Sequence, residues 1–172
     1  MAYQTINPYD GKTVASFDEL DDRQLEGKLA AAASCFEKEW RHTSFAERKA
    51  VLSRAAALMR ERSAELAGLI TLEMGKLIRQ SAGEVALSAS ILDYYAEHAE
   101  AFLAPEKLTT ARGEAVVEST PIGVLFGVEP WNFPYYQIAR FAAPNLMAGN
   151  VVMVKHASNV PQCALAFERV LR

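Results

Sequence analysis

The chain has 172 residues, enough for about one domain of average size with a sizeable core. Hydrophobic residues make up 51% and charged residues 23%, a composition that excludes an intrinsically disordered chain. The net charge of −3 is small and has the wrong sign for a protein that binds phosphate backbones. We therefore expect no nucleic-acid partner.

Neither a membrane span nor a secretory signal is predicted. The longest apolar stretch, residues 138–154, is interrupted by Pro144 and Gly149, and the first residues lack a basic segment followed by an apolar run. Cys35 and Cys163 lie far apart and form no CxxC pair, which suits a reducing compartment. We expect a cytoplasmic protein with no membrane partner.

Charge density divides the chain near Pro105. Residues 1–103 hold 28 of the 39 charged residues, and residues 104–172 hold 11. We accordingly expect three segments: a hairpin and three helices over 1–104, a linker and one strand over 105–121, and a β-α-β-α unit over 122–172.

The first segment begins with a hairpin signal and continues with helical periodicity. Asp10-Gly11 lies between two short β-type runs, and this pair tolerates the positive φ of a tight turn. Apolar residues then recur at helical spacing, in order, over 25–40, 44–74 and 77–104. Ser44 and Glu47 have the spacing of a capping box. Three such amphipathic helices form a bundle or a layer packed onto another element.

The second half changes to the pattern of a parallel sheet. Residues 114–120 alternate like an exposed strand, and two apolar runs of the buried-strand type then alternate with two helical segments. These four elements are predicted over 122–128, 134–147, 151–154 and 161–171. All-apolar parallel strands need neighbours at both edges and helices on both faces. We therefore expect the domain to be truncated at residue 172.

Ligands of parallel sheets bind outside the carboxyl ends of the strands, which here brings residues 129–133 and 155–159 together. Asn132 offers a neutral amide that either stabilises a developing oxyanion or shapes the loop as an Asx turn. Lys155 either contacts the ribose or phosphate of a cofactor or reaches solvent. Ser158 either caps the following helix, its more frequent role, or contacts a phosphate.

Arg140 is the only charged residue between Glu129 and Lys155. On an otherwise apolar helix, its guanidinium either pairs with a structural acid or binds the carboxylate of an anionic ligand. Spacing alone favours the structural pair.

The remaining residues with reactive side chains are expected to have structural rather than catalytic roles. Cys35 and Cys163 fall in helical stretches and are expected to be packing residues. Glu73 and Glu84 are expected to be solvent-facing helix charges. No histidine has metal-ligand spacing, so no metal site is expected, and the GxGxxG fingerprint is absent. These residue patterns alone do not identify an enzyme class.

Several motifs together resemble the aldehyde dehydrogenase superfamily. They are Pro130-Trp-Asn-Phe-Pro134, Ala143-Pro144, Ala148-Gly149-Asn150, Val154-Lys155, Asn7-Pro8 with Asp10-Gly11, and Glu73-Met74-Gly75-Lys76. The resemblance spans the chain and implies the N-terminal part of that α/β fold, a helical layer plus the first strands of a parallel Rossmann-like sheet. Within the superfamily, Glu-Met-Gly-Lys, Tyr95-Ala-Glu-His98 and Lys155-His156-Ala157 look most like succinate-semialdehyde dehydrogenases. His156 replaces a proline that is frequent at this position.

The resemblance implies roles for the residues of the sheet edge. Asn132 is implied to be catalytic, as part of the oxyanion hole, and lines the NAD(P) site with Trp131 and Lys155. Ser158 occupies a position where similar enzymes often have an acidic residue that binds the ribose hydroxyls. Because serine carries no negative charge, it does not repel the 2′-phosphate of NADP. We therefore expect that NADP is accepted as well as NAD. Arg140 matches the position that holds the substrate carboxylate, which reverses the interpretation from spacing.

The implied function of the complete enzyme is NAD(P)-dependent oxidation of an aldehyde, succinate semialdehyde to succinate. The family's nucleophilic cysteine and general-base glutamate lie beyond residue 172, and neither Cys35 nor Cys163 fits the nucleophile's motif, so this chain alone is expected to be inactive. The strand at 114–120 resembles an oligomerisation element, which implies a homo-oligomer. The alternative is a noncatalytic remnant that binds an intact subunit.

Overall fold

The computed structural model describes residues 3–172, so Met1 and Ala2, where the first predicted segment begins, lie outside the described residues. In chain order the elements are β1 (Tyr3–Ile6), β2 (Thr13–Phe17), α1 (Asp22–Lys38), the 3₁₀ helix η1 (Trp40–His42), α2 (Phe45–Glu61), α3 (Ser63–Met74), α4 (Ile78–Phe102), β3 (Glu106–Thr110), β4 (Gly113–Val117), β5 (Val124–Glu129), α5 (Pro134–Met147), β6 (Val151–His156) and α6 (Pro161–Leu171). The predicted α/β class is confirmed.

The N-terminal hairpin forms as predicted, with β1 antiparallel to β2 and Gly11 at a positive φ of 72°. The predicted helix over 44–74 is wrong in one respect, because it is two helices that meet at Arg62. No glycine or proline marks this break, so the apolar spacing continues across it. Described residues 3–104 therefore hold four α-helices rather than three.

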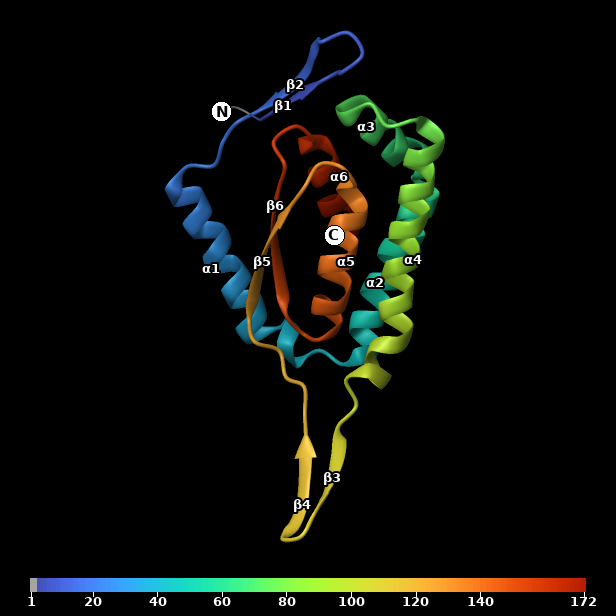
Figure 1. Cartoon of the computed structure of the whole chain (residues 1–172). Coiled ribbons are helices and arrows are strands. Elements are labelled where there is room, and N and C mark those ends of the chain that lie inside the picture. The colour runs from blue at the N-terminus through green and yellow to red at the C-terminus, as the bar shows by residue number, and fades with distance from the viewer. Residues whose placement is uncertain (1–2) are drawn as a thin grey trace.

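Residues 106–110, predicted as linker, form strand β3, which pairs antiparallel with β4. All five residues of β3 are exposed, so the strand lacks the apolar face from which it could have been predicted. The β3–β4 hairpin projects from the body of the molecule (Figure 1).

Strands β5 and β6 pair in parallel from Val124 opposite Val151 to Glu129 opposite His156. Helix α1 lies on one side of this pair and α5 on the other (Figure 1). Gly127 of β5 lies against α5, since a Cβ atom there would come within 2.7 Å of the Phe141 ring. The prediction that residues 122–128 are buried throughout is wrong, because alternate side chains point away from α5 and Phe126 and Val128 are 62% and 69% exposed.

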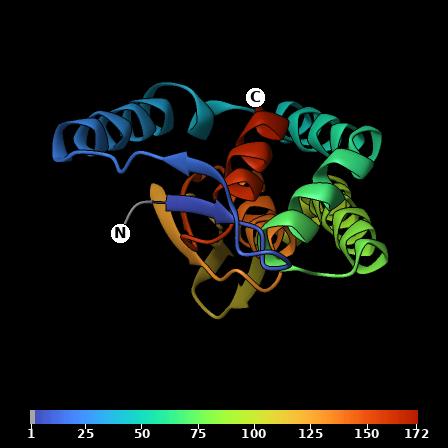
Figure 2. The same ribbon diagram turned by 90° about the horizontal axis from the view of Figure 1, so that it is seen from above.

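The apolar core lies between helices α2 to α4 and helices α5 and α6. Its largest fully buried apolar members are Leu52, Met59, Leu66, Ile70, Val85, Leu92, Tyr135, Met147, Val160, Phe167 and Val170. Figure 2 shows α6 near the centre of the molecule, with α1 to one side and the other helices of the first half opposite. Over residues 3–172, no helix has both the length and the apolar character needed to cross a bilayer.

Candidate functional site

The carboxyl ends of β5 and β6 lie side by side because the two strands pair as far as Glu129 and His156. The loops that follow them, residues 130–133 and 157–160, therefore leave the sheet at one edge, as predicted. Trp131 and Asn132 lie in the first of these loops, Lys155 near the end of β6, and Ser158 in the second loop.

Asn132 is exposed in the loop that leads from β5 into α5. Its backbone carbonyl accepts a hydrogen bond from the Lys76 ammonium at 2.9 Å. Within residues 3–172 its side-chain amide has no hydrogen-bond partner, so the geometry of an Asx turn is absent there. The amide N–H groups are therefore free to donate to a ligand.

Glu84 lies beneath this loop and caps α5. Its Oε1 accepts hydrogen bonds from the Tyr135 and Tyr136 amides at 2.9 and 3.3 Å, and its Oε2 binds Lys76. Because α5 begins with Pro134 and has no local side-chain cap, a carboxylate of α4 satisfies its first N–H groups. The prediction that Glu84 faces solvent is wrong, since 3% of the residue is exposed.

Glu73 caps α6 in the same manner. Its two carboxylate oxygens accept hydrogen bonds from the Gln162 and Cys163 amides, both at 2.9 Å, and the Thr5 hydroxyl donates at 2.5 Å. The residue is 3% exposed, so the prediction of a solvent-facing charge is again wrong. The partners of Glu73 lie on β1 and α6, far away in sequence, and helical periodicity alone does not reveal them.

His156 links the end of β6 to the start of α5. Its Nδ1 accepts a hydrogen bond from the Ala157 amide at 2.8 Å, so its Nε2 carries the proton and donates to the Pro134 carbonyl at 2.9 Å. Burial lowers the pKa of this imidazole. The neutral imidazole therefore connects the two loops of this edge through hydrogen bonds.

Lys155 and Ser158 lie on the surface of the same edge. The Lys155 side chain is exposed, and its ammonium lies 5.5 Å from the centroid of the Tyr3 ring. Ser158 is exposed and does not cap α6, whose N-cap residue is Val160 and whose amides are capped by Glu73. The capping interpretation of Ser158 is wrong. A cation, a hydroxyl and the half-exposed Trp131 indole form a donor set that suits phosphate and ribose groups.

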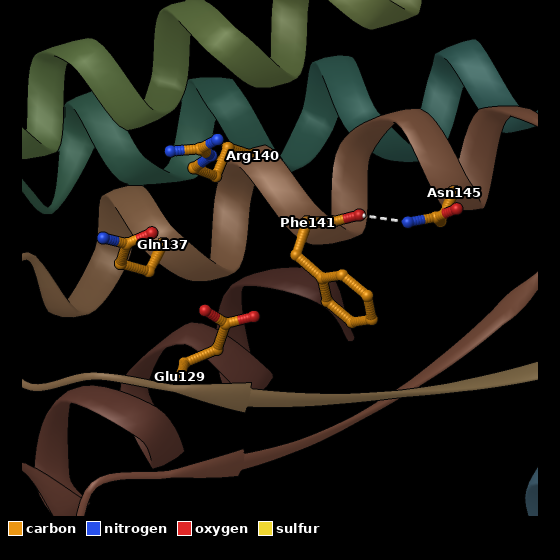
Figure 3. A pocket seen from close by; sticks show the side chains of 5 residues that line it. All are labelled: Glu129, Gln137, Arg140, Phe141 and Asn145. Carbon is orange, nitrogen blue, oxygen red and sulfur yellow. Dashed lines mark hydrogen bonds between the residues drawn. The ribbon is translucent and has the colours of Figure 1, made fainter.

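Arg140 lies further along α5, at a polar pocket with Glu129, Gln137, Phe141 and Asn145 (Figure 3). Its guanidinium donates to the Tyr136 hydroxyl at 3.5 Å and makes no salt bridge with any residue of the described chain. The structural ion pair favoured by spacing is therefore not found there. Burial raises the pKa of the Glu129 carboxyl, and the nearby Arg140 charge offsets part of this rise.

Neither cysteine resembles an activated nucleophile. Cys163 is fully buried and Cys35 is half-buried, and burial raises the pKa of both thiols. Among residues 3–172, no group of three or more His, Cys, Asp or Glu side chains is arranged to hold a metal ion.

The sequence of the whole chain, residues 1–172, matches the model of the aldehyde dehydrogenase family. The chain belongs to the aldehyde dehydrogenase family. The resemblance noted from the motifs is thereby confirmed.

Similar curated proteins include a succinate-semialdehyde dehydrogenase [NADP(+)] of Deinococcus radiodurans, 50% identical over 168 residues. This match covers 98% of the chain and 35% of that protein. A probable succinate-semialdehyde dehydrogenase [NADP(+)] of Synechocystis is 46% identical, with 100% of the chain and 38% of that protein covered. The chain therefore spans little more than a third of these relatives.

Among solved structures, the chain is similar to succinic semialdehyde dehydrogenase from Streptococcus pyogenes in complex with NADP+. The TM-score is 0.95 at 43% identity, over 99% of this chain and 37% of that one. The predicted fold, the N-terminal part of the aldehyde dehydrogenase architecture, is confirmed by this match.

Proposed function

We propose that this chain supplies the N-terminal part of an NADP-accepting succinate-semialdehyde dehydrogenase. The observation that carries the proposal is the free, exposed amide of Asn132 at the carboxyl edge of the sheet. The names of the relatives from Deinococcus radiodurans and Synechocystis support the choice of substrate and cofactor.

In this proposal Asn132 acts on the aldehyde oxygen. A nucleophile's attack on the aldehyde carbon turns the carbonyl oxygen into an oxyanion, and the Asn132 amide N–H donates to that oxygen as its charge develops. Since the amide is not committed to another hydrogen bond in the described chain, it needs no rearrangement to donate. The nucleophilic cysteine and the general-base glutamate are not supplied by this chain.

Arg140 is proposed to select the substrate. Succinate semialdehyde carries a carboxylate at the end opposite its aldehyde, and a guanidinium binds a carboxylate through two parallel hydrogen bonds. Arg140 is exposed and forms no salt bridge within residues 3–172, so its charge is available for such a contact.

Trp131, Lys155 and Ser158 are proposed to hold the cofactor, which accepts a hydride when bound. The Lys155 ammonium attracts phosphate and ribose oxygens, and the Ser158 hydroxyl donates to a 2′-phosphate without repelling it. An acidic side chain at position 158 would favour NAD instead, so Ser158 supports acceptance of NADP beside NAD.

The complete enzyme is proposed to be a cytoplasmic homo-oligomer in which the projecting β3–β4 hairpin contacts another copy. The 172-residue chain alone is proposed to be inactive, because it lacks the nucleophile and the base. The thiols of Cys35 and Cys163 form no disulfide, and this is what a reducing compartment such as the cytoplasm favours.

The test begins with the protein purified from its natural source, its intact mass, and the rate of NADPH formation from succinate semialdehyde and from butanal. The proposal predicts a mass well above 18.9 kDa and a clear preference for succinate semialdehyde. A protein of 18.9 kDa that forms no NADPH and copurifies with a longer homologue would instead support the noncatalytic alternative.

A further inference from the structure

We infer that Lys76 is a positioning residue for Asn132: it fastens the loop of residues 131–133 to the buried carboxylate of Glu84. This inference rests on the proposed function, because it assigns a catalytic purpose to the order of that loop. Lys76 belongs to the Glu73-Met74-Gly75-Lys76 motif, and no catalytic or binding role above uses it.

Lys76 makes two contacts with the loop and one with Glu84 of α4. Its ammonium binds the Glu84 carboxylate, donates to the backbone carbonyl of Asn132 at 2.9 Å, and lies 3.7 Å from the centroid of the Phe133 ring. These contacts involve the peptide group of Asn132 and the next side chain, but not the Asn132 amide. The loop is thus held while its catalytic donor stays free.

Burial makes this arrangement strong and specific. The side chains of Lys76 and Glu84 are 9% and 1% exposed, so water competes weakly for either charge. Glu84 also caps α5 through the Tyr135 amide at 2.9 Å. The Glu84 carboxylate therefore binds both the first turn of α5 and Lys76, which in turn contacts the loop of residues 131–133.

The turn between α3 and α4 delivers Lys76 to this position. Gly75 ends α3 with a φ of 73°, a left-handed conformation that other residues rarely adopt. A Cβ atom there would also come within 3.1 Å of Pro8 in the N-terminal hairpin. The motif as a whole thus performs two tasks, since Glu73 caps α6 and Lys76 reaches the loop ahead of α5.

Removal of the Lys76 charge should loosen the loop without emptying the cofactor site. The experiment compares K76M with K49M in the protein as its source makes it. Lys49 is a matched control, since it also pairs with a glutamate of α4, Glu97 at 2.5 Å, but on the exposed surface. All variants carry phenylalanine in place of every tryptophan of that protein except Trp131, W40F included, so Trp131 is the fluorescent probe of the loop.

Three quantities are measured: acrylamide quenching of Trp131, the kcat for succinate semialdehyde, and the Kd for NADP. For K76M we expect quenching to rise about two-fold or more as the loop loosens. We expect kcat to fall at least about ten-fold, within the roughly 10²–10³-fold effect of losing an oxyanion donor. The Kd for NADP should rise much less than kcat falls, because K76M loosens Trp131 but leaves the proposed Lys155 and Ser158 contacts in place.

Quenching and kcat of K76M that match those of K49M would overturn the inference, as would a loosened loop with unchanged kcat. E84Q provides the same comparison if K76M does not fold, because its amide oxygen can still accept from Tyr135 while the charge that attracts Lys76 is lost. A wild-type protein that oxidises no aldehyde would defeat the proposed function, whereas the quenching comparison would still decide whether Lys76 orders the loop.

Discussion

The buried cap of α6 offers the sharpest test of how the two halves of the chain are joined. In E73Q the side chain keeps its size but loses its charge and one acceptor oxygen. If the remaining oxygen keeps Thr5 and Gln162, the new NH₂ group faces the Cys163 amide, and two donors then point at each other in a buried site.

The cost follows from these contacts. A hydrogen bond to a charged group contributes about 1.5–3 kcal/mol, and the Cys163 amide loses one. Removing a negative charge from the N-terminus of α6 adds about 0.3–1 kcal/mol. We therefore expect E73Q to lower the free energy of unfolding by about 2–4 kcal/mol.

Urea unfolding of E73Q and E65Q measures this difference. Glu65 lies on the same helix, half-exposed, and binds Arg62 at 2.6 and 2.9 Å. An exposed pair of this kind contributes about 0–1 kcal/mol, so E65Q controls for the loss of one charge from α3. If E73Q and E65Q unfold with the same free energy, the claim that Glu73 caps α6 is refuted.

Three further predictions concern Arg140, Ser158 and His156. R140L should lower kcat/KM for succinate semialdehyde by about 100-fold and that for butanal by less than about two-fold, and an equal loss for both would exclude a carboxylate anchor. S158E should weaken the binding of NADP relative to that of NAD by about ten-fold or more in cofactor titrations at one ionic strength. N159E adds the same charge at the next residue and should have a smaller effect. Equal effects of the two variants would exclude a contact between Ser158 and the 2′-phosphate. Burial holds the pKa of His156 below its unfolded value of about 6.5, so stability should fall as the pH drops below that value and the unfolded chain takes up a proton. The slope from this group is at most about 1.4 kcal/mol per pH unit, and H156N should lose it while H98N, at an exposed site, should not; identical slopes in the wild type and H156N would contradict this assignment.

Periodicity predicted most of the elements because it reports which face of each helix or strand is buried. Helices α4, α5 and α6 and the parallel pair β5–β6 follow closely from apolar spacing. The break at Arg62 and strand β3 were missed for opposite reasons. The apolar pattern runs through Arg62 without a glycine or proline, and β3 has no buried face at all.

The buried glutamates were missed because their partners lie far away in sequence. Glu84 binds an amide 51 residues away, and Glu73 binds one 90 residues away. A usable signal was nevertheless present. Helices α5 and α6 both begin with proline after Phe133 or Val160, neither of which can cap a helix, so their free amides required an acceptor from another element.

The positions of the site residues could be predicted because parallel strands bring their carboxyl ends to one edge. Their roles could not, since Asn132 and Arg140 have structural as well as chemical interpretations in the sequence. Within residues 3–172 the Asn132 side chain makes no hydrogen bond and Arg140 makes no salt bridge, so the partners that their structural interpretations require are not found there. Their chemical roles stay predictions.

The most direct test of the central claim is the kcat of N132A for succinate semialdehyde, measured beside its Kd for NADP in the protein as its source makes it. If the Asn132 amide donates to the developing oxyanion, kcat should fall by about 10²–10³-fold, far more than the Kd rises from the loss of a side chain that lines the cofactor site. A kcat within about two-fold of the wild type would contradict the account, because an oxyanion donor cannot be removed without a loss in kcat.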